Sequence, residues 1–407
     1  MKYAVVTFGC RVNQADSLTI EDGLRARGGS AASPDEADVV VVNTCSVTAG
    51  ADQAARQTIR RLTRINPDVR IVVTGCYATR EPNAVSTLPN VVRVVPNAEK
   101  DTLVDDFFGD GDGPCGTTLS PGVAGRTALT LRVQTGCEEA CSYCIIPQTR
   151  GASRSHSPAD VVRRIGQAVA SGYKEIAITG VHLGSYGRDR GDGSSLTSLV
   201  GALAAWQGDV RFRISSLEPM DCSPEIVDQV ASSPRVAPHF HLPLQHGSDR
   251  MLRAMRRPYT VSYYEALVTG IREQIPHAAI GSDIIVGFPG ETAGDFDEMC
   301  RSLDRLPLTH LHVFPYSDRP GTVASRMTPK VDGRDIRARA AAVRAIGDRM
   351  ARAFRTSQIG RTYRALTVDD GRSVVTGNYL KLRLDEQRPR NEWLDVRVTG
   401  EYSGLSH

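Results

Sequence analysis

Three short apolar runs within residues 1–100 each end at a cysteine. The runs are YAVVTFGC, DVVVVNTC and RIVVTGC, which end at Cys10, Cys45 and Cys76. Each has the length of a buried strand and is followed by a segment with helical spacing, so the pattern predicts three β/α units. Such alternation is typical of a parallel sheet covered by helices, in which ligands gather at the carboxyl ends of the strands. We therefore expect the three thiols to lie in one crevice.

The same alternation continues from about residue 127 to 330. Strands are predicted at residues 130–134, 175–179, 211–215, 239–243, 282–287 and 311–315. One intervening helix has Ser157 as a candidate N-cap and Pro158 at its first position. Its apolar positions are Val161, Val162, Ile165 and Val169. Six successive β/α units predict a partial barrel, curved but not closed like a full TIM barrel.

The pattern changes after residue 330. A long helix with a basic outer face is predicted over residues 331–358. Its apolar stripe consists of Ile336, Ala340, Val343, Ile346 and Met350. Beyond it, RALTVDD, SVVTGNYLKLRL and WLDVRVTG alternate apolar and polar residues between turns, which indicates a small antiparallel β-barrel over residues 359–407. The predicted fold class is thus α/β, with an antiparallel unit at the C-terminal end.

Composition limits the class of protein. A chain of 407 residues with 41% hydrophobic and 23% charged residues is ordinary for a soluble protein of two or three domains. It has no apolar run of transmembrane length, and MKYAVVTFGC leads into a strand instead of a signal peptide, so we expect a cytoplasmic enzyme with no membrane partner. Nine cysteines in that compartment favour metal ligands or catalytic groups over disulfides. The net charge of +3 says little about partners.

The stretch QTGCEEACSYCIIP holds Cys137, Cys141 and Cys144 at the spacing C-x3-C-x2-C. Three thiolates on one short loop can each bind one iron of a [4Fe-4S] cluster and leave the fourth iron without a protein ligand. An open metal position is where chemistry takes place, as in catalytic zinc sites. A structural zinc loop or a disulfide scaffold is the alternative, but no fourth ligand follows at a matching spacing.

The other cysteines fall into two groups. Cys10, Cys45 and Cys76 stand at equivalent strand ends and suit a second cluster with its own open iron, although buried cysteines are also common as small hydrophobic residues. The remaining three lack a partner motif and are interpreted as structural: Cys115, Cys222 and Cys300.

The later barrel strands end in polar or glycine-rich stretches that should face the barrel mouth. These are ITGVHLGSYG, ISSLEP, HLPLQHGS, DIIVGFPGE and VFPYSDRPGT. Ser216 and Glu218 are candidates for ribose hydroxyls, and Gly180 and Gly287 for close approach of the backbone to a cofactor. Glycine and proline also make ordinary βα turns, which is the alternative.

Three histidines occur close together in the fourth of these strands and just after it. Alternation along a strand places His239 and His241 on one face and leaves His246 beyond it. We favour packing or substrate contact over metal binding for them.

Five motifs together resemble the radical S-adenosylmethionine (SAM) methylthiotransferases. They are TFGCRVNQADS, VVNTCSVT, CSYCIIPQTRGASRS, HLPLQHGSDRMLRAMRRPYT and DIIVGFPGET, and the resemblance covers essentially the whole chain. Within the family the chain is most similar to the MtaB-type branch, which adds a methylthio group to C2 of the threonylcarbamoyladenosine just 3′ of the anticodon in tRNA. Sister branches modify isopentenyladenosine in tRNA or an aspartate of a ribosomal protein.

The resemblance implies SAM and two [4Fe-4S] clusters as cofactors. SAM would bind the open iron of the loop cluster and, on one-electron reduction, yield a 5′-deoxyadenosyl radical that abstracts hydrogen. The cluster on the first three cysteines would carry or donate sulfur, which a second SAM methylates. An electron donor such as a flavodoxin or ferredoxin and a sulfur source are implied partners. Tyr143 would pack near the adenine, and Arg150 and Arg154 would meet the SAM carboxylate or the RNA backbone.

The resemblance also implies a division of the chain. Residues 1–115 would form the methylthiotransferase domain, 127–330 the radical SAM domain, 331–358 a connecting helix and 359–407 a TRAM-like RNA-binding domain. The expected phosphate contacts are Arg361, Arg364, Lys381 and Arg383, with Tyr379 stacking on a base.

A non-catalytic iron-sulfur or zinc RNA-binding protein is the alternative, but it would have no need of an open iron.

Overall fold

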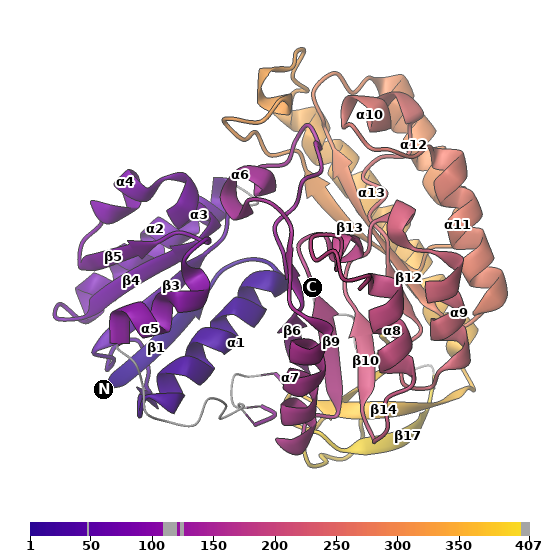
Figure 1. Cartoon of the computed structure of the whole chain (residues 1–407). Coiled ribbons are helices and arrows are strands. Elements are labelled where there is room, and N and C mark those ends of the chain that lie inside the picture. The colour runs from indigo at the N-terminus through magenta and orange to yellow at the C-terminus, as the bar shows by residue number, and fades with distance from the viewer. Residues whose placement is uncertain (47–48, 109–119, 123–125, 400–407) are drawn as a thin grey trace.

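The structure is a computed structural model that describes residues 1–46, 49–108, 120–122 and 126–399. Figure 1 shows an N-terminal sheet unit beside a larger β/α unit, with a small C-terminal sheet against one end of the larger unit. Cys115 lies outside the described residues.

The N-terminal sheet has five parallel strands in the order β2-β1-β3-β4-β5. Their bounds are β1 Lys2–Thr7, β2 Ser30–Ala31, β3 Val39–Thr44, β4 Arg70–Gly75 and β5 Val91–Val95. The three predicted strands are confirmed as β1, β3 and β4, which are neighbours in the sheet. The two strands at the edges were not predicted.

Helices cover both faces of this sheet. They are α1 Arg11–Ala26, α2 Ala49–Ile65, α3 Cys76–Arg80, α4 Pro82–Ser86, the short 3-10 helix η1 Lys100–Thr102 and α5 Leu103–Phe108. Successive residues of a strand point to opposite faces, so Val41 packs in one core with Leu24 of α1, and Val40 packs in another with Ile59 of α2.

The central unit contains the six predicted strands in sequential order. They are β6 Leu129–Arg132, β9 Glu175–Thr179, β10 Arg211–Ile214, β11 His239–His241, β12 Ala279–Val286 and β13 His310–Pro315. Two groups of three parallel strands, β6-β9-β10 and β11-β12-β13, meet at a bridge between Phe212 and Val236. Because β6 and β13 do not pair within the described residues, the partial barrel is confirmed.

Helices form the outer layer of the barrel. They are α7 Pro158–Ala170, α8 Leu196–Ala204, α9 Pro224–Ser232, α11 Val261–Gln274 and α12 Ala293–Arg305, and two shorter ones are α6 Ile146–Arg150 and α10 Asp249–Ala254. Ser157 caps α7 as predicted, because its hydroxyl accepts the Asp160 backbone N–H at 3.1 Å. Val161 and Ile165 are buried, but Val162 is 41% exposed and does not belong to the core.

The C-terminal part begins with helix α13, Gly333–Gln358, whose predicted apolar stripe packs against the barrel core. A four-stranded antiparallel sheet follows in the order β16-β15-β14-β17. Its strands are β14 Thr362–Val368, β15 Ser373–Thr376, β16 Lys381–Arg383 and β17 Trp393–Arg397. Antiparallel pairing is confirmed, whereas β16 and β17 do not pair within residues 359–399, so these residues form an open sheet.

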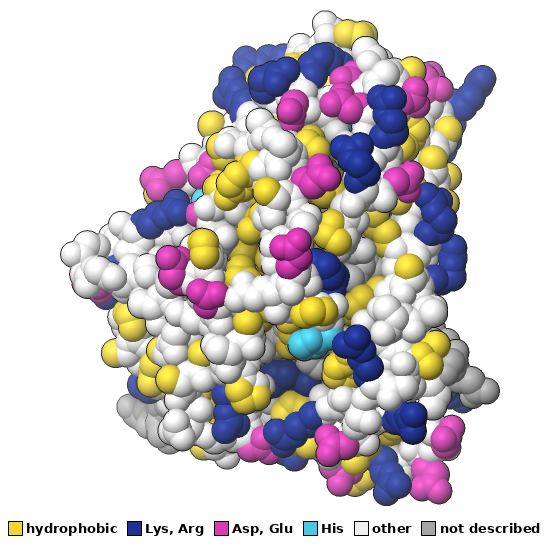
Figure 2. Space-filling model, turned by 90° about the vertical axis from the view of Figure 1, so that its right-hand side faces the viewer, with side chains coloured by type: hydrophobic (Ala, Val, Ile, Leu, Met, Phe, Trp, Pro, Cys, Tyr) yellow, Lys and Arg dark blue, Asp and Glu magenta, His cyan; other side chains and the backbone are white. Residues whose placement is uncertain are grey.

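No helix in the described part of the chain is long and apolar enough to cross a bilayer. Figure 2 shows acidic and basic side chains intermingled on one face of the molecule, without a large patch of a single sign.

Candidate active site

The cysteines of the first triad lie at the carboxyl ends of three adjacent parallel strands. Cys10 is the N-cap of α1 after β1, Cys45 follows β3, and Cys76 opens α3 after β4. Cys45 and Cys76 are buried, and Cys10 is exposed. Strand order therefore gathers the three thiols at one edge of the sheet, as the sequence predicted.

A glycine with positive φ precedes three of the candidate ligands. Gly9 has φ +88° and an ideal Cβ there would lie 2.3 Å from the Cys45 sulfur. At Gly75, with φ +98°, a Cβ would lie 2.1 Å from the Thr44 carbonyl oxygen. Gly136, before Cys137, has φ +78°. Only glycine fits such close approaches in this backbone conformation.

The second triad lies on the loop between β7 (Gln134–Thr135) and α6. Arg257 donates a guanidinium N–H to the Cys141 sulfur at 3.1 Å, and the Ile146 backbone N–H lies 3.4 Å from the Cys144 sulfur. Burial raises the pKa of the Cys144 thiol to about 12 and also raises the pKa of Cys141. A coordinating metal would deprotonate these thiols, and the three thiols on one short loop, with the Arg257 guanidinium beside Cys141, fit metal ligation.

Two cations flank this loop. His182 lies 2.7 Å from Asp221, and although burial alone would lower its pKa, hydrogen bonds to Asp221 and Cys137 raise it to about 10. Arg257 forms an ion pair with Glu218 and donates to the Tyr259 hydroxyl at 2.9 Å. A cluster bound by three thiolates is anionic overall, and these cations would stabilise it.

The predicted cofactor residues are brought together only in part. Glu218 is ion-paired beside Cys141, and Tyr143 packs in an apolar cluster around Phe288 next to the loop. Gly180 and Ser216 line the main cavity. Gly287 does not line that cavity; a Cβ there would lie 2.4 Å from Ile336 of α13, so its close approach is to a helix.

A cavity of about 550 Å³ lies between the N-terminal unit, the barrel and the C-terminal sheet. Cys10, Gly180, Ser216 and Tyr379 are among its lining residues. Its volume is within the range of small-molecule sites. One candidate cluster ligand therefore faces the same space as the ends of the barrel strands.

Histidines line the same cavity from two strands. His239 and His241 of β11 point into it together, as predicted, and His310 and His312 of β13 do the same. His246 is buried elsewhere, with its Nε2 3.7 Å from Glu291.

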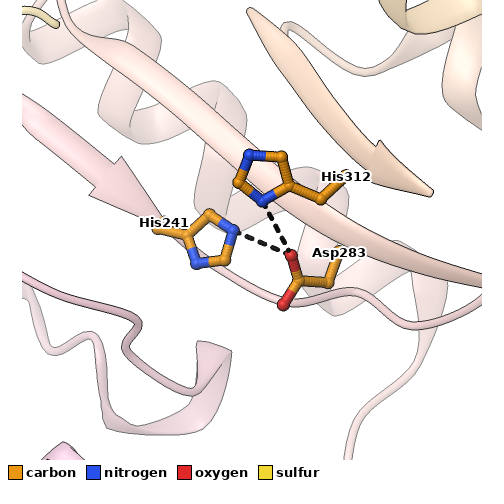
Figure 3. Close-up of side chains that lie close together, drawn as sticks. All are labelled: His241, Asp283 and His312. Carbon is orange, nitrogen blue, oxygen red and sulfur yellow. Dashed lines mark hydrogen bonds and ion pairs between the residues drawn. The ribbon is translucent and has the colours of Figure 1, made fainter. Parts of the chain in front are cut away.

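Among the described residues, His241, Asp283 and His312 form the one group of three whose ligand atoms all lie within 4.8 Å of one another, the composition and spacing of a site for a single metal ion. Figure 3 shows both imidazoles directed at one carboxylate oxygen, at 3.0 Å from His241 and 3.2 Å from His312. Ser216 hydrogen-bonds the other nitrogen of His241 at 2.7 Å. One oxygen of this carboxylate therefore lies close to two imidazoles.

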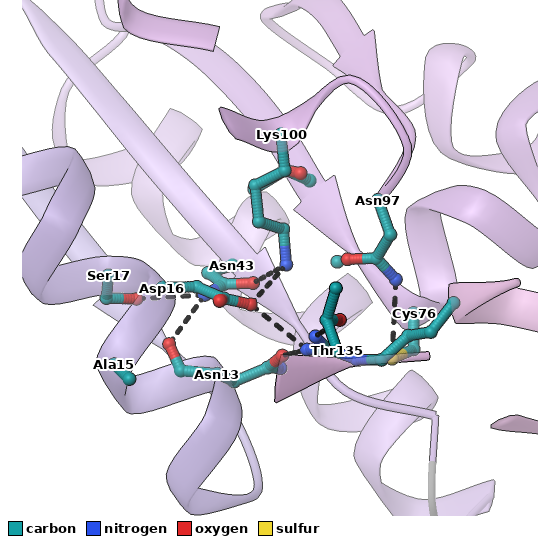
Figure 4. A network of polar contacts seen from close by, with 12 residues as sticks. Asn13, Ala15, Asp16, Ser17, Asn43, Cys76, Asn97, Lys100 and Thr135 are labelled. Atoms are coloured by element: carbon teal, nitrogen blue, oxygen red, sulfur yellow. Dashed lines mark hydrogen bonds and ion pairs between the residues drawn. The ribbon is translucent and has the colours of Figure 1, made fainter. Parts of the chain in front are cut away.

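A buried ionic network joins the two units. Asp16 of α1 accepts from Lys100 at 3.0 Å (Figure 4). It also accepts from Arg132 of β6 at 2.6 Å and from Arg150 of α6 at 3.0 Å. Burial alone would raise the pKa of Asp16, but the three cations hold it well below its usual range. Asn97 adds a link, because its amide lies 3.6 Å from the Cys76 sulfur and donates to the Thr149 carbonyl of α6 at 2.9 Å.

The expected anion contacts of two arginines differ in the structure. Arg150 is buried in the Asp16 network, so its carboxylate partner belongs to the protein. Arg154 is exposed in the short strand β8, Arg154–Ser155.

The residues expected to contact RNA lie in different surroundings: two are exposed, two are ion-paired and one lines the main cavity. Arg361 and Arg383 are exposed on the C-terminal sheet. Arg364 is ion-paired with Asp209 at 2.7 Å, and Lys381 with Asp369 at 2.7 Å. Tyr379 lies on the turn between β15 and β16 and lines the main cavity instead of an open sheet surface.

The sequence patterns did not identify the residues that link the two units or those that place positive charge beside the cysteine loop. Asp16, Lys100 and Arg132 carry no motif of their own, and nothing local separates Arg257 from Arg256. His182 lies inside the quoted stretch ITGVHLGSYG, where its position before a glycine-rich turn was the available signal. The cysteines assigned as structural fit that assignment, because Cys222 is buried in the barrel core and Cys300 packs against it.

Two family models match the chain. The model described as "Uncharacterized protein family UPF0004" matches residues 2–96, and that of the radical SAM superfamily matches residues 131–303. Among solved structures, the radical S-adenosylmethionine methyltransferase TsrM from Kitasatospora setae has a TM-score of 0.58 at 15% identity, over 80% of this chain and 73% of that one. This likeness concerns the fold.

Curated relatives are similar to this chain over most of its length. The threonylcarbamoyladenosine tRNA methylthiotransferase MtaB of Aquifex aeolicus is 36% identical over 94% of this chain and 96% of its own length. The tRNA-2-methylthio-N(6)-dimethylallyladenosine synthase of Acidothermus cellulolyticus is 32% identical over 99% of this chain and 84% of its own length. The chain therefore belongs to the radical SAM methylthiotransferase family. Enzymes of this family use SAM and two [4Fe-4S] clusters.

Asp16→Asn should destabilise the protein strongly, by about 3–5 kcal/mol, because it leaves the buried Lys100 and Arg150 without their anion and Arg132 with Asp101 alone. Asp101→Asn is the matched control, since Asp101 binds the same Arg132 but is half exposed, and it should cost at most about 1 kcal/mol. Urea unfolding at pH 7 measures both. Since the folded pKa of Asp16 is lowered, its contribution is complete above about pH 4 and declines below it. Equal losses in the two variants would contradict this assignment.

Arg257→Gln should lower the reduction potential of the loop cluster, because hydrogen bonds to sulfur and nearby positive charge favour the reduced, more negative state. A redox titration followed by electron paramagnetic resonance measures the shift. Arg256→Gln is the neighbouring control, and its potential should match the wild type. An unchanged potential in Arg257→Gln would show that the contact with Cys141 does not tune the cluster.

Proposed function

We propose that this enzyme adds a methylthio group to C2 of N6-threonylcarbamoyladenosine, the nucleoside next to the anticodon in tRNA. The observation that carries the proposal is the placement of two cysteine triads on joined units, with Cys10 of one triad facing a cavity at the strand ends of the other. Relatives of both the MtaB name and the dimethylallyladenosine name cover most of the chain, which supports tRNA as the substrate class.

The residues have separate tasks in this mechanism. Cys137, Cys141 and Cys144 would hold one cluster, and Cys10, Cys45 and Cys76 the other. When bound, the clusters and SAM supply the radical, the sulfur and the methyl group that replace the hydrogen at C2. Arg257 and His182 supply positive charge at the loop, and the Asp16 network fixes one triad relative to the other.

The division of the chain follows the same proposal. Residues 1–115 would serve sulfur transfer, 127–330 radical chemistry, 331–358 the connection and 359–407 RNA binding as a TRAM-like domain. Gly180 and Ser216, in the cavity wall, would contact SAM or the substrate nucleoside. The reaction requires an electron donor such as a flavodoxin or ferredoxin, and a sulfur source.

Methylthiolation of isopentenyladenosine is the second candidate, supported by the 32% identity to the Acidothermus enzyme. The cavity wall is largely apolar, but it also carries four histidines and Arg11. These hydrogen-bonding groups support threonylcarbamoyladenosine, because an isopentenyl group would leave them without a partner. A ribosomal-protein aspartate has no such support in the relatives described above.

Removal of each cysteine triad should separate the two half-reactions. The anaerobically reconstituted wild type should hold about eight irons, and Cys10→Ala/Cys45→Ala/Cys76→Ala about four. That variant should still form 5′-deoxyadenosine from SAM but no methylthiolated nucleoside. Alanine at all three loop cysteines should abolish both products. Iron analysis and mass spectrometry of tRNA nucleosides measure these outcomes.

Cys300→Ala is the control for the triad variants, since Cys300 packs against the barrel core away from both triads. It should keep about eight irons and full product. A wild type that methylthiolates only isopentenyladenosine would refute the proposed substrate, and one that cleaves no SAM with both clusters loaded would refute the proposed chemistry.

Arg361→Ala/Arg383→Ala should weaken tRNA binding and reduce the slope of log affinity against log salt by about 1–2, because each lost phosphate contact removes nearly one unit. Both side chains are exposed and form no ion pair with the described residues. Arg372→Ala, in the turn before β15 and 3.8 Å from Asp370, is the control and should change the slope less. Filter binding at several salt concentrations measures this; an unchanged slope would place the RNA elsewhere.

A further inference from the structure

One corner of the main cavity is built by side chains that are distant in sequence. Arg11 comes from the start of α1, His239 from β11 and Tyr379 from the turn between β15 and β16. Arg11 donates to the Tyr379 hydroxyl at 2.9 Å, and the rings of His239 and Tyr379 lie 4.7 Å apart between centroids. The three side chains therefore form one contiguous surface.

The three side chains of this corner have polar atoms that no described residue hydrogen-bonds. Arg11 has no carboxylate partner among the described residues, and its guanidinium has further N–H donors beyond the one that Tyr379 accepts. The Tyr379 hydroxyl, acting as acceptor, keeps its own hydrogen to donate. His239 is 4% exposed, yet its Nδ1 has no partner. Buried polar atoms without a partner are rare in proteins, so the corner is suited to a ligand rich in acceptors.

Neighbouring charges favour an anion at this position. Asp283 is the one carboxylate that lines the cavity, and His241 and His312 contact one of its oxygens (Figure 3). Arg213 lies over the Tyr379 ring, 4.7 Å from its centroid, so a second cation adjoins the corner, although Glu175 pairs with it at 3.1 Å. Arg11 is therefore the cation at the corner that has no carboxylate partner among the described residues, and it can pair with an anionic ligand.

The backbone holds Tyr379 in this position at a conformational cost. Its φ is +65°, which is uncommon for a residue with a side chain. The neighbouring Asn378 is buried and donates to the His277 carbonyl at 3.0 Å, and the Leu380 N–H donates to Thr376 at 2.9 Å. Such over-determined, strained residues cluster at ligand sites.

We propose that Arg11, His239 and Tyr379 bind the carboxylate of the threonyl group on the substrate base. This inference rests on the proposed function and deepens it. Threonine joined through its amino group keeps a free carboxylate, whereas an isopentenyl group is an uncharged hydrocarbon. A guanidinium forms strong charge-assisted hydrogen bonds with a carboxylate. The corner thereby selects threonylcarbamoyladenosine over isopentenyladenosine.

The test compares two anticodon stem-loops that carry the threonylcarbamoyl group, one with the free carboxylate and one with the neutral carboxamide. Equilibrium affinity for the cluster-loaded enzyme is measured for both. The wild type should bind the carboxylate form about 10- to 100-fold more tightly, as expected for hydrogen bonds to a charged group. Arg11→Gln should bind both forms alike, and Arg11→Lys should regain part of the preference.

Arg163→Gln, an exposed arginine on α7, is the control and should keep the full preference. Equal wild-type affinity for the two stem-loops would overturn the inference, even if the enzyme methylthiolates threonylcarbamoyladenosine. An equal loss of affinity for both forms in Arg11→Gln would also overturn it, since that is the result of a purely structural role. A wild type that prefers the carboxylate but forms no methylthiolated product would refute the proposed function and leave the inference standing.

Discussion

The buried carboxylate of Asp16 is the interaction on which the arrangement of the site depends. It lies on the N-terminal unit and binds Arg132 and Arg150, which belong to the barrel unit, together with Lys100 from its own side. A buried charge without its partners is costly, so these contacts favour the observed docking of the two units. That orientation sets the thiols at the sheet edge beside the mouth of the barrel.

One of the cations that join the units, Arg150, also adjoins candidate cluster ligands, and a separate arginine does the same at the loop. Arg150 adjoins Cys76 and Cys10 as well as Asp16, and Arg257 adjoins Cys141. Docking and the electrostatics of the thiols are therefore parts of one charge system. Thiolate-bound clusters bring negative charge, so their loading and the docking of the units should stabilise each other.

Local periodicity made much of the fold predictable. The cysteine-ended strands and the six barrel strands are apolar runs of strand length, whereas the missed strands lie at sheet edges, where Ser30–Ala31 has two residues and Val91–Val95 is half buried. The candidate ligands were predictable because their spacing is local. Tyr379 was placed on an RNA surface because its contact with Arg11 spans 368 residues and leaves no local pattern.

The cavity takes its walls from both ends of the chain, with Cys10 and Arg11 on one side and Tyr379 on the other. During synthesis, the N-terminal sheet and the barrel strands leave the ribosome long before residue 379. An unfinished chain can therefore carry every candidate cluster ligand while one wall of its cavity is still missing. The order of synthesis thus delays this wall of the cavity until residue 379 has been made.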